Sequence, residues 1–177
     1  MKERIEVSAY AQRINEALRK GILLNTHGDK FNSMVIGWGA LGTVWSRPAF
    51  TVYVRQGRYT RSQLDKTGAF TVSIPLEGIS PTISKVCGSQ SGYNVDKVEA
   101  AGLTLEPPEV NGVSGLREYP ITLECRVLYA QKQEISLLPE AIQARMYPRD
   151  VDGSNPMSNR DPHTMYIGEI VAAYIIR

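Results

Sequence analysis

The sequence predicts a mainly β domain, an antiparallel barrel with short helical insertions and an N-terminal helix. Short runs rich in β-branched and aromatic residues recur along the chain, and the helical signals between them are brief. A doubly wound α/β sheet, which needs long helices between its strands, is the weaker alternative. The 177 residues, of which 42% are apolar, suffice for one core, and no linker or repeat divides them. We expect a single domain over residues 1–177.

Residues 8–20 are expected to form the N-terminal amphipathic helix. Ser8 is the expected N-cap, and Gly21 marks the end after two basic residues. The apolar residues that fall near one face are Ala9, Ile14, Ala17 and Leu18. Strands are expected over residues 22–27, 34–38, 50–54, 70–74, 121–131 and 165–176.

The remaining helical signals are short. Residues 60–63 have the form of a capping box and lead into a helix that ends at Gly68. Two more short helices are expected over residues 81–86 and 139–146. Residues 148–162 are rich in Asp, Gly, Ser, Asn and Pro and are expected to form a loop.

Composition excludes several classes of function. The net charge of +2 is too small for a nucleic-acid binder, and the longest apolar run, residues 170–176, is too short to span a membrane. The charged N-terminus does not resemble a signal peptide, so a cytoplasmic location is expected. Cys87 and Cys125 are isolated, which predicts two buried thiols, no disulfide framework and no metal site.

A glycine pattern at residues 37–42 resembles a dinucleotide fingerprint but does not predict one. The residues that follow include Val44, Trp45 and Pro48, where the fingerprint requires a helix. We expect residues 37–42 to be extended or in a turn, with bare backbone against which a flat ligand can lie.

A second pattern predicts an anion site. Arg55 and Arg58 follow a predicted strand, Thr60 begins a predicted helix, and Gly57 lets the connection turn inward. Guanidinium groups and a helix start are typical donors to phosphate oxygens. Two solvated arginines at a turn remain the alternative.

These segments, taken together, resemble the flavoredoxins, FMN-binding split-barrel relatives of flavin reductases. The resemblance covers about residues 20–175 and depends on five motifs in order. They are Asn32 to Gly39, Ser46 to Pro48, Val54 to Thr60 with Gly68 and Phe70, Ser91-Gly92 through Asp96-Lys97, and Asp161 to Ile170.

The resemblance implies a role for each motif. One strand would meet the isoalloxazine ring of FMN: Asn32, Ser33, Met34, Val35, Ile36, Gly37 and Trp38. A second group would line the edge of the ring: Ser46, Arg47 and Pro48. A third would hold the phosphate: Arg55, Arg58, Tyr59 and Thr60. The catalytic candidates, near the ring or the nicotinamide side, are Lys97 and His163.

The residues alone leave other roles open for several of these positions. Judged from the residues alone, Lys97 could be a solvated surface lysine as readily as a residue near the flavin. His163 could likewise be a polar residue at a strand edge as readily as a residue near the ligand. Trp38 and Trp45 are equally consistent with the core or with a subunit interface. In the flavin reading, Lys97 would bring positive charge to the ring.

The implied function is that of an FMN-binding electron carrier of the flavoredoxin type. NAD(P)H or another redox protein would be the donor, since the sequence has no cluster ligands for an internal relay. Two alternatives stay open: an NAD(P)H:flavin oxidoreductase that uses flavin as a substrate, and a flavin-binding protein without catalysis. The resemblance also implies a homodimer.

Overall fold

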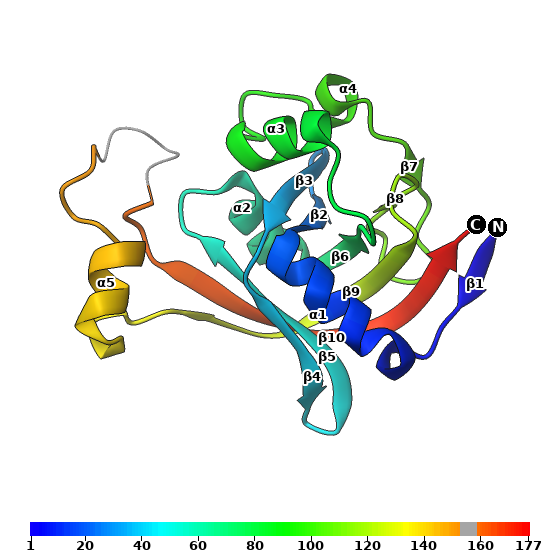
Figure 1. Cartoon of the computed structure of the whole chain (residues 1–177), viewed down its shortest axis with the longest axis horizontal. Helices are drawn as coiled ribbons and strands as arrows, with labels where there is room; N and C mark the ends of the chain where they lie inside the picture. The colour runs from blue at the N-terminus through cyan, green and yellow to red at the C-terminus, as the bar shows by residue number, and fades with distance from the viewer. Residues whose placement is uncertain (153–158) are drawn as a thin grey trace.

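The computed structural model describes residues 1–152 and 159–177 and is dominated by one antiparallel sheet (Figure 1). Its strands follow the order β3-β2-β6-β9-β10-β5-β4, and β1 pairs with β10. The strands of this sheet are β1 (Lys2–Arg4), β2 (Ile22–His27), β3 (Phe31–Ile36), β4 (Gly39–Val44), β5 (Arg47–Arg55), β6 (Ala69–Ile74), β9 (Ile121–Lys132) and β10 (His163–Ile176). The antiparallel prediction is confirmed.

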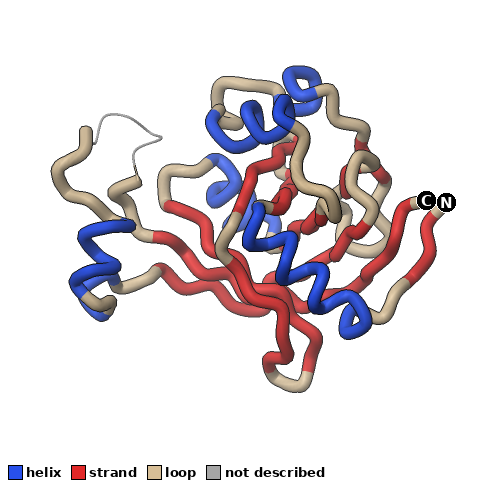
Figure 2. Tube along the Cα trace, in the orientation of Figure 1, coloured by secondary structure: helices blue, strands red, loops and turns tan. Residues whose placement is uncertain are grey.

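The helices are short and connect or flank the strands (Figure 2). They are α1 (Ala11–Lys20), α2 (Tyr59–Thr67), α3 (Pro81–Ser89), α4 (Lys97–Ala101) and α5 (Glu140–Met146), with 3-10 turns η1 (Val7–Tyr10) and η2 (Ile135–Leu137). A two-stranded sheet joins β7 (Leu105–Glu106) and β8 (Gly115–Leu116). Within these described residues, no helix combines the length and the apolar character needed to cross a membrane.

The main core lies between the curved sheet and α1. Ile14 and Leu18 of α1 belong to the same buried cluster as Val52, Val72 and Leu123 from three strands. In Figure 1, α1 crosses the sheet between the β3 side and the β4–β5 hairpin. Burial of this apolar face stabilises the helix, which ends at Gly21 as predicted.

The last strand, β10, has more pairing partners than a strand with one neighbour on each side. It pairs with β1, β5 and β9, and its pairing with β9 contains two irregularities, one of them between Ile167 and Gly168. A Cβ on Gly168 would lie 2.6 Å from two atoms of the Phe70 ring and 3.0 Å from the Cβ of Cys125. The strand passes over the ring only because residue 168 has no side chain.

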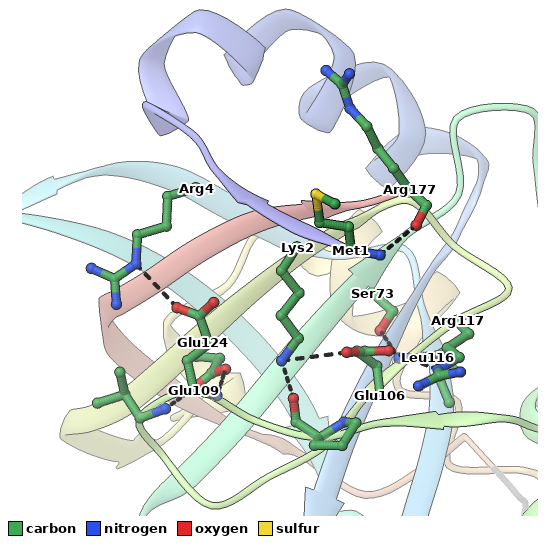
Figure 3. A network of polar contacts seen from close by, with 12 residues as sticks. Met1, Lys2, Arg4, Ser73, Glu106, Glu109, Leu116, Arg117, Glu124 and Arg177 are labelled. Carbon is green, nitrogen blue, oxygen red and sulfur yellow. Dashed lines mark hydrogen bonds and ion pairs between the residues drawn. The ribbon is translucent and has the colours of Figure 1, made fainter.

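A network of charged groups connects strand β1 to the β7–β8 region (Figure 3). The Glu124 carboxylate is buried and accepts hydrogen bonds from the backbone N–H groups of Glu109, Val110 and Asn111. Lys2 forms an ion pair with Glu106 at 3.5 Å. A carboxylate with several N–H donors offsets the cost of its own burial.

Several local predictions are wrong at the helix starts. Ser8 does not cap a helix, because residues 7–10 form a 3-10 turn and α1 begins at Ala11 without a side-chain cap. Thr60 does not begin a capping box, because α2 begins one residue earlier, with Arg58 as the N-cap, and the Thr60 hydroxyl accepts a hydrogen bond from Asn32. The stop at Gly68 is confirmed.

The strand predictions hold, with shifted ends. The strand expected over 34–38 is Phe31–Ile36, and β1 has no counterpart among the predictions. Residues 39–44 form β4, which confirms that the glycine pattern at 37–42 does not open a helix. In the loop expected over 148–162, residues 148–152 and 159–162 are neither helix nor strand, and 153–158 lie outside the described residues.

Substitution Gly168→Ala should destabilise the domain by about 1–3 kcal/mol, because its Cβ would overlap the Phe70 ring in a packed core. Gly42→Ala on β4 is the matched control, since nothing lies within 4 Å of its Cβ position. Urea unfolding of both variants measures the effect. Equal stability of the two variants would contradict the proposed close approach.

Candidate functional site

A cleft of about 260 Å³ lies where β3 and β5 end, β10 begins, and α2 and α3 approach the sheet. Figure 1 labels these elements. Strand register places His163, the first residue of β10, opposite Arg55, the last residue of β5. The lining residues are Asn32, Met34, Val35, Ile36, Gly37, Trp38, Tyr53, Arg55, Arg58, Tyr59, Thr60, Cys87, Gly88, Gln90, Ser91, Gly92, Lys97, Asn159 and His163. They include three cations and no carboxylate.

Arg55 is a buried cation that joins the cleft to the segment after α5. Its guanidinium donates to the backbone carbonyls of Met146, Asn159 and Asp161, at 2.7 to 3.0 Å. Burial lowers the pKa of Arg55, and the Asp161 carboxylate, 4.0 Å away, opposes that shift. Neutral carbonyls satisfy the donors without cancelling the charge.

Arg58 borders the start of α2. Its side chain donates to Asn159 Oδ1 at 3.2 Å, and burial lowers its pKa while Asp161 raises it. As the N-cap of α2, Arg58 makes no side-chain capping bond. A helix start and an arginine therefore face the same end of the cleft, an arrangement typical of anion sites.

Asn32 and Gly92 form a close-packed cradle beside this end. Asn32 Nδ2 donates to the Thr60 hydroxyl at 2.8 Å, whereas Asn32 Oδ1 is buried without a hydrogen-bond partner among the described residues. A Cβ on Gly92 would lie 2.3 Å from that oxygen and 2.5 Å from Tyr59 Cδ1. Glycine at residue 92 therefore lets the chain pack directly against this unpartnered oxygen, where any side chain would collide.

Lys97 is the third cation, and its side chain is buried. Its Nζ donates to the carbonyls of Ser33 at 2.7 Å and Cys87 at 3.4 Å. Burial lowers the pKa of Lys97 to about 8; Cys87 opposes this shift, and the charges of Arg58 and Lys30 add to it. The reading of Lys97 as a solvated surface lysine is wrong.

Aromatic rings also line the cleft. The rings of Trp38 and His163 lie 4.8 Å apart at an interplanar angle of 36°. Tyr147 contacts the other side of the imidazole, with its hydroxyl 2.9 Å from His163 Nδ1. Burial lowers the pKa of His163 to about 3, and the charges of Arg55 and Arg58 act in the same direction.

A second, more open hollow of about 550 Å³ lies beyond Trp38. Gly37, Trp38 and Tyr53 line both hollows and so form the partition between them. The remaining residues of the second hollow are Asn15, Leu18, Arg19, Gly39 and Gln133.

Residues 20–177 match the profile of the flavin reductase like domain. The chain belongs to the flavin reductase-like family. This membership and its antiparallel sheet confirm the predicted split-barrel fold, which a solved flavin reductase from Shewanella frigidimarina also has, with a TM-score of 0.64 at 17% identity over 97% of this chain and 75% of that one.

Among solved structures, this flavin reductase-like chain is similar to two flavoredoxins. The flavoredoxin of Methanosarcina acetivorans has a TM-score of 0.61 at 25% identity, over 88% of this chain and 67% of that one. The flavoredoxin of Desulfovibrio vulgaris (Miyazaki F) has a TM-score of 0.63 at 23% identity, over 89% and 69%. An uncharacterized protein of Archaeoglobus fulgidus is 30% identical over 100 residues, which are 56% of this chain and 55% of that relative's length.

The cleft contains most of the residues that sequence analysis selected. Those it brings together are Asn32, Met34, Val35, Ile36, Gly37, Trp38, Arg55, Arg58, Tyr59, Thr60, Lys97 and His163. Ser33 is not in the lining, and its contribution is the carbonyl that accepts from Lys97. Ser46, Arg47 and Pro48 are not brought to this cleft, because they lie at the turn of the β4–β5 hairpin, where Arg47 pairs with Glu169.

Sequence analysis missed several lining residues. Tyr53 has the same orientation as Arg55, two residues along β5, so strand alternation was a usable signal. The end of α3 forms part of the cleft wall, through Cys87, Gly88 and Gln90. Nothing in the local sequence pattern indicates that these three residues line a cleft. Ser91 and Gly92 were noted only as part of the resemblance.

The pKa of Lys97 predicts a pH-dependent stability. Between pH 8 and 10.5 the unfolded chain binds more protons at this lysine than the folded chain, so the free energy of unfolding rises with pH. Lys97→Met should remove this rise, which amounts to roughly 3 kcal/mol at most.

Urea unfolding at several pH values measures that rise, and Lys85→Met, which removes an exposed lysine of α3, is the control. The Lys85 variant should keep the wild-type slope. The same slope in all three proteins would contradict a neutral Lys97 at high pH.

Proposed function

We propose that this protein binds FMN in the cleft and carries electrons from a reduced donor to an acceptor. The single observation that carries the proposal is the lining of the cleft, whose described residues include three cations, several aromatic rings and no carboxylate. FMN has the matching shape, a flat ring system joined to a dianionic phosphate. The flavoredoxin likeness supports the same ligand.

The residues present fit this cofactor at both ends. Arg58, Thr60 and the start of α2 would hold the phosphate, and the unpartnered Asn32 Oδ1 would accept a hydrogen bond from a ligand hydroxyl or N–H. Trp38 and Tyr53 would border the ring. Arg55 would act mainly by fixing the wall, since three carbonyls already occupy its donors.

Bound FMN would supply the redox chemistry, by accepting and releasing electrons. The protein's own contribution would be positional and electrostatic. Lys97 would hold a positive charge in a dry wall, where it attracts negative charge more strongly than it would in water. NAD(P)H or a small redox protein would bring the electrons. The two free, buried cysteines suit the reducing conditions of the cytoplasm.

The β4–β5 hairpin supports a homodimer as part of this proposal. Trp45 and Ser46 form its two-residue turn with φ of 50° and 59°, a conformation that normally selects Asn or Gly. Trp45 is 60% exposed and its ring packs edge-on against exposed Tyr129, 6.3 Å away. A strained turn that presents an exposed indole fits a surface covered by a second copy.

Gel filtration after incubation with FMN tests the cofactor and the assembly together. We expect FMN to elute with the protein, at the mass of a dimer, and its visible absorbance to bleach when NADH, NADPH or a reduced redox protein is added without oxygen. FMN that elutes separately but accelerates NAD(P)H oxidation would favour the flavin oxidoreductase. Bound FMN that no donor reduces would favour a binding protein, and no binding would contradict the proposal.

Substitution Arg58→Ala should weaken FMN more than riboflavin, because only FMN has the phosphate. The loss of one charge-assisted hydrogen bond, about 1.5–3 kcal/mol, corresponds to roughly 10- to 100-fold in Kd. Fluorescence titration with both ligands measures the difference. Arg61→Ala is the matched control, since Arg61 lies on the same helix, pairs with Asp65 and does not line the cleft. Equal weakening of both ligands by Arg58→Ala would contradict a phosphate contact.

A further inference from the structure

A chain of hydrogen bonds runs from the cleft to the end of β9 through His163. The hydroxyl of Tyr147, just after α5, lies 2.9 Å from His163 Nδ1 and donates to Gln133 Oε1 at 2.9 Å. The backbone N–H of Gln133 also donates to the carbonyl of His163 at 2.8 Å. Gln133 is therefore held beside His163 by the main chain as well as through the phenol.

Proton counting along this chain decides the state of the imidazole. A phenol has a single proton, and with the Gln133 amide placed so that Oε1 faces the phenol, the Tyr147 proton is directed to that oxygen. The phenol oxygen then presents only lone pairs to His163 Nδ1, so the bond between them requires a proton on Nδ1. We propose that Gln133 and Tyr147 fix His163 as the Nδ1–H tautomer, with Nε2 as a hydrogen-bond acceptor for a ligand in the cleft.

The surroundings of His163 keep the ring neutral. Arg55 from β5 and Arg58 from the following turn act against a second positive charge, and burial acts the same way, so its pKa lies near 3. The Arg55 guanidinium also lies 5.1 Å from the centre of the Tyr147 ring. The acidic group in this region, Asp161, is drawn to Arg55. His163 therefore stays an acceptor throughout the physiological pH range.

Nε2 is the nitrogen left for a ligand. It has no hydrogen-bond partner among the described residues, and the ring lines the cleft while Trp38 restricts its rotation. An acceptor at this place binds an N–H or O–H donor and repels carboxylate and phosphate oxygens. The imide N–H of a flavin and the carboxamide N–H of a nicotinamide both belong to the donor class. The cleft thus offers two kinds of contact, cationic groups that attract an anion and an imidazole nitrogen that accepts from a donor.

Nitrogen-15 NMR of histidine-labelled protein tests the tautomer without any flavin, so its outcome is independent of the proposed function. The chain has two histidines, and a His27→Asn background leaves the signals of His163 alone. We expect a protonated Nδ1 and an unprotonated Nε2, unchanged between pH 5 and 8. A proton on Nε2, or protonation of both nitrogens within that range, would overturn the proposal.

Substitution Gln133→Leu then tests the relay itself. With no acceptor at residue 133, the Tyr147 proton is free to turn to His163 Nδ1, and the histidine proton should move to Nε2. Gln131→Leu is the matched control, because Gln131 accepts from Tyr129 in a similar pair on the exposed face of β9. The control should keep the wild-type tautomer. An unchanged tautomer in Gln133→Leu would show that Gln133 does not set it.

Discussion

Phe70 occupies the space that a side chain on residue 168 would take, and this contact restricts what the last strand can carry at that point. With glycine at that point, β10 passes over the ring, continues along β5, and places His163 opposite Arg55. The same strand pairs with β9 over most of its length and with β1 at its end. The position of the cleft therefore depends on the path of β10, and that path is compatible with the core only while residue 168 has no side chain.

The cleft retains positive charge that the fold neutralises only in part, through the Asp161 carboxylate 4.0 Å from Arg55. Lys97 donates to carbonyls of Ser33 and Cys87, and Arg55 donates mainly to carbonyls, so their hydrogen bonds are satisfied while their charges remain. Burial of such groups costs free energy, as the lowered pKa of each shows. An anionic ligand would recover part of this cost, which makes the cleft a place where stability has been exchanged for binding.

The sequence predicts the strands well, because alternation and β-branched runs report directly on the sheet. Most of the cleft residues follow from the family resemblance, and only Arg55, Arg58 and Thr60 also follow from a local pattern. Its errors arise where a tertiary contact competes with a local one. Thr60 resembles a helix cap, yet its hydroxyl accepts a hydrogen bond from Asn32 of β3. β1 contains Lys, Glu and Arg, which have no strand signal, and forms by pairing with β10. Motif order likewise could not show that Ser46 to Pro48 lie at a hairpin turn away from the cleft.

The partition between the two hollows has a practical consequence. Trp38 is one of two tryptophans in the chain, and its ring is stacked on His163, between the hollows. The other, Trp45, is at the tip of the β4–β5 hairpin. Indole emission responds to the polarity and quenching groups around it. The protein thus contains two built-in optical reporters in separate places, one for occupancy of the cleft and one for contacts of the hairpin.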